Sequence, residues 1–175
     1  MERILRDTVK RVKFAFALRQ FGGDQSGVLV MQALRDVDLD HDGETPEQLR
    51  EKANQLLLAM ETELFPAERE SLIALYSQNW RQRRAAADFL PIYFRPYLDG
   101  VVKNPHSVDK LVARHFIAER DRDHGWSLAE LAGELREDRD ALREAADRIA
   151  IEADKLVSVA LENLSHALAR NTASA

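Results

Sequence analysis

The 175-residue sequence contains no cysteine, and this absence removes several kinds of chemistry at once. Disulfide bridges, thiolate nucleophiles and zinc sites with cysteine ligands are all excluded. Long apolar runs are also missing, since the longest are only a few residues, whereas a helix that spans a bilayer needs roughly 20. Residues 1–21 mix charged with apolar side chains and lack a small-residue cleavage site, unlike a signal peptide. The sequence therefore predicts a soluble, cytoplasmic protein with no membrane contact.

Several signatures of catalysis and metal binding are missing as well. The five histidines form no pair with the spacing of metal ligands, which disfavours a zinc or di-iron site. The chain has no glycine-rich phosphate loop and no nucleophile elbow of the G-x-S-x-G type. We therefore expect a protein that is not an enzyme and that holds no cofactor.

The residues that are present favour amphipathic helices. Apolar residues make up 45% of the chain and charged residues 31%, which allows a sizeable core with wet outer faces. Near the N-terminus, apolar residues recur at the three- and four-residue steps of one buried helical stripe: Ile4, Leu5, Val9, Val12 and Phe16. Strand-like alternation is nearly absent. We expect an all-α fold, a compact multi-helix domain with helix-turn-helix-like units and a long C-terminal helix, formed by residues 1–175 as one domain or as two lobes, 1–63 and 64–170.

Local signals place the ends of the helices. Thr45 with Gln48 and Ser127 with Glu130 each match a capping box, in which two side chains satisfy the free amides at a helix start. Gly22 ends the first helix. The expected helices cover residues 1–21, 27–35, 45–63, 66–77, 79–90 and 105–123, followed by a short helix after residue 127 and a long one over 138–169.

The long C-terminal helix carries two rows of residues spaced seven apart. One row holds Leu142, Ile149 and Leu156 and continues with Asn163. The other row consists of the small residues Ala146, Ala153, Ala160 and Ala167. Since a row of alanines lets another helix approach closely, we expect this helix to pack within the chain or at the seam of a homodimer.

An acidic loop over residues 36–45 partly matches the calcium-binding loop of an EF-hand. Asp38, Asp40 and Asp42 precede Gly43 with the spacing of the first ligands. The position of the bidentate glutamate is Leu49 instead. A solvated linker is therefore the favoured interpretation, and we expect no metal site.

Positive charge gathers in two segments of a chain whose net charge is −5. Residues 1–21 carry +4 and residues 79–103 carry +3, which leaves −12 for the remainder. In the second segment arginines, which bind phosphate, alternate with aromatic rings, which stack on unpaired bases. An equally simple reading is that the rings belong to the core and the arginines to a solvated helix face. The candidate residues for contact with nucleic acid or another polyanionic partner are Trp80, Arg81, Arg83, Arg84, Tyr93 and Arg95, together with Lys10 and Lys13.

Residues 64–102 open with the pattern L-x-P-x-E-R-E-x-L-x-x-L-Y. This opening resembles the start of the promoter-reading helix-turn-helix domain of sigma factors, and some phage antitermination and late-gene regulators look similar. In such a motif Ala85–Ala87 and Leu90 would belong to the first helix and Tyr97 to the second, whereas Pro91 and Pro96 depart from the pattern. The resemblance implies a phage-type regulator of transcription that contacts DNA or RNA polymerase.

Residues 127–149 also fit helix-turn-helix spacing, with apolar or small residues at Leu128, Leu131, Ala132, Leu135, Leu142 and Ala145. Acidic residues accompany Arg139, Arg143 and Arg148 on the second helix of this unit, and carboxylates repel phosphates. Protein contact or plain helical packing therefore fits this unit better than DNA contact.

Three functions remain open from the sequence, and one of them, a metal-dependent or small-molecule-binding helical protein, rests only on the acidic loop from Asp38 to Asp42. The leading expectation is a helical transcription regulator acting on DNA or RNA polymerase, and the alternative is a helical protein–protein adaptor or inhibitor without a nucleic-acid role. The two are separated by whether the basic candidates share one surface.

Overall fold

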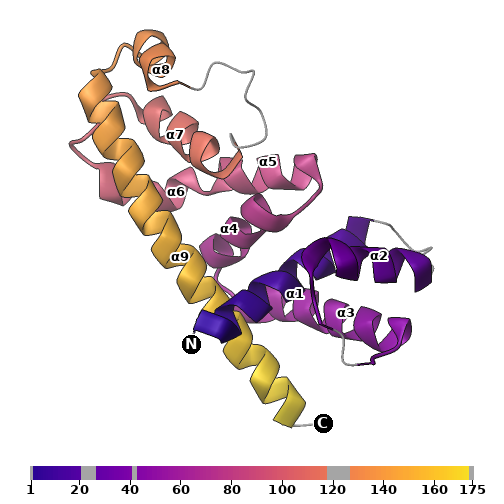
Figure 1. The fold of residues 1–175 in the computed structure, drawn as a ribbon. Coiled ribbons are helices and arrows are strands. Elements are labelled where there is room, and N and C mark those ends of the chain that lie inside the picture. The colour runs from indigo at the N-terminus through magenta and orange to yellow at the C-terminus, as the bar shows by residue number, and fades with distance from the viewer. Residues whose placement is uncertain (1, 21–26, 41–42, 118–126, 174–175) are drawn as a thin grey trace. The chain divides into compact units, whose positions relative to one another are not determined.

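The computed structural model describes residues 2–20, 27–40, 43–117 and 127–173, and this part of the chain contains helices but no strand (Figure 1). The all-α prediction is therefore confirmed. In chain order the elements are α1 (Glu2–Gln20), α2 (Gly27–Val37), α3 (Pro46–Glu63), α4 (Pro66–Tyr76), α5 (Trp80–Phe89), α6 (Pro91–Phe94), the 3-10 helix η1 (Arg95–Leu98), α7 (Pro105–Ile117), α8 (Leu128–Leu135) and α9 (Arg139–Ala173). None of the described helices has the length and apolarity that crossing a membrane requires.

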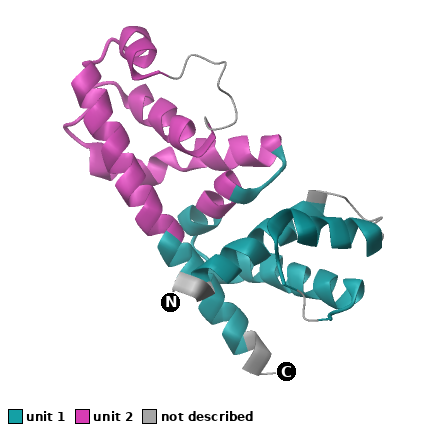
Figure 2. Cartoon of the chain, in the orientation of Figure 1, with its two compact units in different colours: residues 1–69, 76–79, 158–175 teal, residues 70–75, 80–157 magenta. Residues whose placement is uncertain are grey.

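The described residues group into two compact units, shown in separate colours in Figure 2. Unit 1 comprises residues 1–69, 76–79 and 158–175, and unit 2 comprises residues 70–75 and 80–157. The sequence-based lobes instead divided the chain once, between residues 63 and 64. The units interleave along the chain because α4 and α9 each contribute residues to both units.

In unit 1 the first three helices contact one another pairwise. Residues 14–18 of α1 are all buried, so this half of the helix is enclosed on more than one side. Val12 and Phe16 of the predicted stripe are buried, whereas Leu5 and Val9 are half-buried and the side chain of Ile4 lies outside the described residues. One narrow stripe is thus too simple a description of α1.

In unit 2 helix α7 contacts α5, α6 and α8. Its Phe116 ring lies 6.2 Å from the ring of Phe94 on α6, and both rings are at most 2% exposed. Proline occupies the first position of α6 and the second position of η1, where its fixed φ is tolerated but continuation of a long helix is not. The segment where the sigma-factor resemblance implies a second helix therefore forms two four-residue turns of helix instead.

Helix α9 has the length that the sequence predicts. Leu142, Ile149 and Leu156 are 0–5% exposed, and Ala153, Ala160 and Ala167 are 0–2% exposed. Both predicted rows are thus buried within the chain, except that Ala146 and Asn163 are half-buried. A homodimer seam along these rows would require the side chains to leave the core that they already occupy.

Both predicted capping boxes are confirmed. The Thr45 amide donates to Gln48 Oε1 at 2.8 Å, and the Gln48 amide donates to Thr45 Oγ1 at 3.3 Å. Ser127 and Glu130 exchange the same two bonds, each at 3.2 Å, at the start of α8. Each unit therefore contains a helix whose start is set by a local capping box.

Candidate functional site

Helix α5 carries most of the candidate contact residues, and its two sides differ sharply. The side that faces the core of unit 2 continues through α6 at helical spacing, with buried residues Arg83, Ala86, Ala87, Leu90 and Phe94. Leu90 keeps right-handed helical dihedrals of −62° and −27°, so the helical path bends little where α5 passes into α6. The remaining side is exposed.

Arg83 lies on the buried side, which corrects its assignment as a contact residue. Its side chain is 5% exposed. Its Nε donates to the carbonyl oxygen of Ala74 at 2.8 Å, and its second terminal nitrogen donates to the carbonyl oxygen of Phe116 at 2.9 Å. Burying a guanidinium is costly unless its donors are satisfied, and these bonds help to satisfy them. Arg83 is therefore a structural residue of unit 2 rather than part of a surface.

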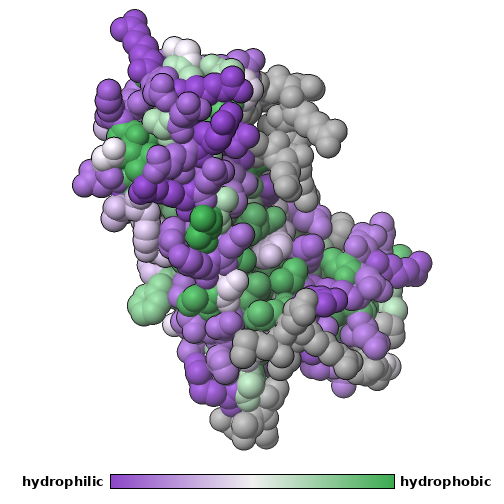
Figure 3. All heavy atoms as spheres, turned by 60° about the vertical axis from the view of Figure 1, so that its left-hand side comes forward, coloured by the Kyte–Doolittle hydropathy of each residue, from purple (hydrophilic) through white to green (hydrophobic). Residues whose placement is uncertain are grey.

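The exposed side of α5 continues onto α6 and combines charged with apolar residues. We call it the α5–α6 face, and its members, at steps of one, three and four residues, are Arg81, Arg84, Ala85, Asp88, Phe89 and Ile92. Phe89 is 40% exposed and Ile92 67% exposed, which are high fractions for large apolar side chains. On the side of the molecule drawn in Figure 3, apolar residues reach the surface in patches bordered by hydrophilic ones.

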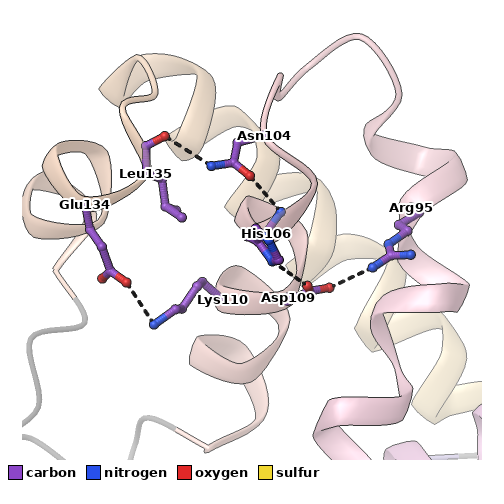
Figure 4. Close-up of polar contacts among 7 residues, drawn as sticks. All are labelled: Arg95, Asn104, His106, Asp109, Lys110, Glu134 and Leu135. Atoms are coloured by element: carbon purple, nitrogen blue, oxygen red, sulfur yellow. Dashed lines mark hydrogen bonds and ion pairs between the residues drawn. The ribbon is translucent and has the colours of Figure 1, made fainter.

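Two of the candidate arginines are bound to carboxylates of unit 2. Arg84 Nε contacts Asp88 Oδ1 at 3.0 Å, one helical turn away. Arg95 contacts Asp109 Oδ1 at 3.1 Å, and the other oxygen of Asp109 lies 3.5 Å from His106 Nδ1. Figure 4 shows these polar contacts, which run from η1 to the first turns of α7. These pairs lower the positive potential that the two arginines offer to a phosphate.

The aromatic candidates differ in their exposure. Trp80 is 46% exposed at the start of α5. Tyr93 is half-buried, and its ring packs edge-on against Phe94 at 5.2 Å and at a tilt of 43° against Tyr97 at 5.6 Å, measured between ring centres. Tyr97 is 41% exposed. Trp80 and Tyr97 thus present ring surface, whereas Tyr93 is largely committed to its neighbours.

The basic candidates of α1 belong to unit 1. Lys10 Nζ bonds to the carbonyl oxygen of Asp38 at 2.6 Å and to its Oδ2 at 2.9 Å. Lys13 Nζ lies 5.7 Å from the centre of the Tyr76 ring, a cation–π contact. Burial raises the pKa of Tyr76 above its ordinary value of 10.0. Lys10 and Lys13 therefore bind to groups of their own unit, and the basic candidates divide between two units rather than forming one set.

The contact between Lys10 and Asp38 also affects the loop that resembles a calcium-binding loop. Asp38, which would be its first ligand, has a φ of 51° and is bound to Lys10. That lysine, by its hydrogen bond and then its charge, lowers the pKa of Asp38 below the ordinary 3.8. Asp42 lies outside the described residues. Among the residues that the structure describes, no three histidine or acidic side chains are arranged to hold a metal ion.

The second helix-turn-helix-like segment forms α8, a turn and α9. Arg143 lies 3.7 Å from Asp140, and Arg148 lies 2.6 Å from Glu144. Arg148 also donates to the carbonyl oxygen of Tyr97 at 3.3 Å, which ties α9 to η1. Because these arginines are paired within unit 2, the segment is better suited to packing than to binding phosphate, in line with the acidic residues in its sequence.

Glu137 is a structural residue that sequence reasoning missed. It follows α8, and its Oε1 accepts the backbone amides of Lys103, at 2.6 Å, and Asn104, just before α7. Asn104 reaches back from the start of α7 and donates to the carbonyl oxygen of Leu135 at 3.3 Å, as Figure 4 shows. No local sequence pattern predicts the contact between Glu137 and Asn104, because the two residues lie more than thirty positions apart in the chain.

One exposed surface of unit 2 thus remains as a candidate for a binding function, the α5–α6 face with its apolar pair, together with two separate exposed rings, Trp80 at the start of α5 and Tyr97 in η1. Comparison of the chain with protein-family models, with curated proteins and with solved structures gave no significant match.

Proposed function

We propose that the protein is a non-enzymatic helical regulator that acts by docking onto another protein through the α5–α6 face. The observation that carries this proposal is the exposure of Phe89 and Ile92 beside Arg81 and Arg84 on one side of a helix. RNA polymerase is the first partner to test, because the segment around this face resembles sigma factors.

The composition of the face supports a protein partner. Aromatic residues and arginine are enriched in the cores of protein interfaces, where they contribute most of the binding free energy. Phe89 and Ile92 would each lose solvent contact on docking, which stabilises a complex by roughly 25 cal/mol for each Å² of apolar area removed from water. Adjacent exposed apolar side chains bordered by polar residues are typical of protein interaction sites.

The charges define the chemistry of the partner surface. Arg81 and Arg84 are three residues apart on the face, and Asp88 engages only part of the Arg84 guanidinium. A partner helix with apolar side chains flanked by carboxylates would place its apolar side on Phe89 and its acidic side on the two arginines. Rim charges of this kind mainly accelerate association.

DNA is the second candidate, and one observation favours it. Trp80 and Tyr97 each expose ring surface, and each follows or precedes an arginine closely in the chain, so each ring could stack on an unpaired base. Against it, Asp88 and Asp109 sit beside the cations that phosphates would need. The observations therefore favour the protein partner, and DNA becomes an outcome of the test.

The test compares two double variants for binding to bacterial RNA polymerase, duplex DNA and single-stranded DNA at two salt concentrations. We expect Phe89→Ser with Ile92→Ser to weaken polymerase binding at least tenfold at both salt concentrations, since it removes the apolar contact. Arg81→Ala with Arg84→Ala should weaken it mainly at low salt. The matched control is Arg139→Ala with Arg143→Ala, which removes the same charge from exposed positions of the same unit.

Two results would overturn the protein-docking proposal. Equal polymerase binding by the wild type and the Phe89/Ile92 variant would show that the apolar pair makes no contact. DNA binding that falls steeply with salt and depends on Arg81 and Arg84 would instead establish the nucleic-acid function. If the wild type binds none of the three at micromolar concentration, the polymerase-directed regulator is excluded.

A further inference from the structure

Unit 1 contains a pocket of about 430 Å³ that the docking proposal does not use. It is bounded by α1, by the chain after α2, by α3 and by the last part of α9. Its volume falls in the range of roughly 300–1,000 Å³ that small-molecule sites occupy. The pocket therefore has room for a small organic ligand.

The inner wall of the pocket is apolar. It is formed by Phe14 of α1, by Leu49 and Leu56 of α3 and by Leu168 of α9. Phe14, Leu49 and Leu56 are only 2–3% exposed, because they are also part of the core of unit 1. These three side chains are thus held by the packing of the helices and form a fixed floor of the pocket, with only a small part of their surface open to it.

The rim of the pocket is charged, with residues of both signs. Lys52 is bound to Glu44, so these two charges neutralise each other. Arg11 is exposed and forms no ion pair with any residue that the structure describes. Asp40, also on the rim, adds negative charge. The rim therefore offers one guanidinium to a ligand and disfavours a ligand with more than one negative charge.

We propose that this pocket binds an amphipathic monocarboxylate, with its carboxylate on Arg11 and its hydrocarbon or aryl body against Phe14, Leu49 and Leu56. A guanidinium matches a carboxylate through two parallel hydrogen bonds. The apolar body gains affinity by leaving water. A phosphate monoester carries nearly two negative charges and would face Asp40 and Glu44 on the same rim.

Octanoate is the probe that tests this assignment, and 1-octanol and octyl phosphate separate the contributions of body and headgroup. In calorimetric titrations we expect octanoate to bind and Arg11→Gln to weaken it at least tenfold. The affinity for 1-octanol should stay within twofold, since it has no carboxylate. The matched control is Arg35→Gln, an exposed arginine on α2 that does not line the pocket.

A second variant tests the place of binding rather than the headgroup. Gln55 is exposed at the mouth of the pocket, so Gln55→Trp should fold normally and obstruct entry. It should weaken octanoate and 1-octanol alike. The Phe89/Ile92 variant of unit 2 should leave both affinities unchanged, which keeps this test separate from that of the docking face.

Three outcomes would overturn the proposal. Absence of octanoate binding at millimolar concentration would exclude the site. Equal weakening by Arg11→Gln and Arg35→Gln would mean that only general charge attracts the probe. Tighter binding of octyl phosphate than of octanoate would replace the carboxylate with a phosphate ligand.

Discussion

The two units use the same two devices, a capping box and a cation that ties distant segments together, but they build them differently. In unit 1 the box pairs Thr45 with a neutral Gln48, and the tying cation, Lys10, is partly exposed. In unit 2 the box pairs Ser127 with an ionisable Glu130, and the tying cation, Arg83, is buried. The comparison shows that the exposure of a side chain to solvent decides its structural role more than its residue type does.

The energetic consequence follows from solvation. An exposed cation that loses its partner regains water, so little free energy is lost. When a buried cation is removed, its acceptor atoms are left without a hydrogen bond from either protein or water. Each unsatisfied acceptor then lowers the free energy of unfolding. We therefore expect the ties of unit 2 to contribute more to stability than those of unit 1, and four measurements can break or sharpen this contrast.

The largest effect is expected for Arg83→Met. The variant leaves the carbonyl oxygens of Ala74 and Phe116 without their buried donors. We expect a loss of about 3 kcal/mol in the free energy of unfolding, measured by urea denaturation. Arg84→Met on the exposed side is the control and should change stability by less than about 0.5 kcal/mol. Equal midpoints for the two variants would contradict the structural role of Arg83.

The second prediction concerns Glu137, the carboxylate that accepts the amides before α7. Glu137→Ala should cost about 2 kcal/mol, because it removes an ionised acceptor from the half-buried amide of Asn104 and from that of Lys103. Glu134→Ala is the matched control, since Glu134 only forms an exposed pair with Lys110 at 3.0 Å. If both variants unfold at the same urea concentration, the clamp contributes nothing in solution.

These two positions show what the sequence could and could not predict. The helices and both capping boxes were predictable, because their signals lie within a few residues of one another. Arg83 was not, because its acceptor at Phe116 is 33 residues away, and its neighbour Arg84 has the same type but the opposite environment. The pocket of unit 1 draws its wall from three helices, so no local pattern marks it.

The third prediction separates the two capping boxes by pH. Hydrogen bonds from Ser127, first from its side chain and then from its backbone, lower the pKa of Glu130 below the ordinary 4.5. Because the folded-state pKa is depressed, the ionised Glu130 stabilises the fold above pH 4.5, and this contribution is lost as the pH falls through the folded-state value. The melting temperature of the wild type should exceed that of Glu130→Gln at pH 7, and the gap should close in acid.

Unit 1 supplies the control for this titration. Gln48 does not ionise. The difference in melting temperature between the wild type and Gln48→Ala should therefore be the same at pH 7 and at pH 4. If the difference in melting temperature between the wild type and Glu130→Gln is also independent of pH, the charge of the Glu130 carboxylate does not contribute to the stability of the capping box.

The smallest effect is expected for Lys10→Met, and its readout is a titration rather than stability. Lys10 lowers the pKa of Asp38 first through a hydrogen bond and then through its charge, so the variant should raise the titration midpoint of the Asp38 carboxyl toward 3.8. Carboxyl carbon shifts measured by NMR between pH 2 and pH 6 report this directly. Lys13→Met should leave the midpoint unchanged, because Lys13 lies over Tyr76 instead. Since the pair is exposed, salt should reduce the difference between wild type and Lys10→Met. If the Asp38 carboxyl has the same titration midpoint in both proteins at low salt, Lys10 does not interact with Asp38 in solution. Unit 1 would then have no exposed counterpart to the buried Arg83 of unit 2.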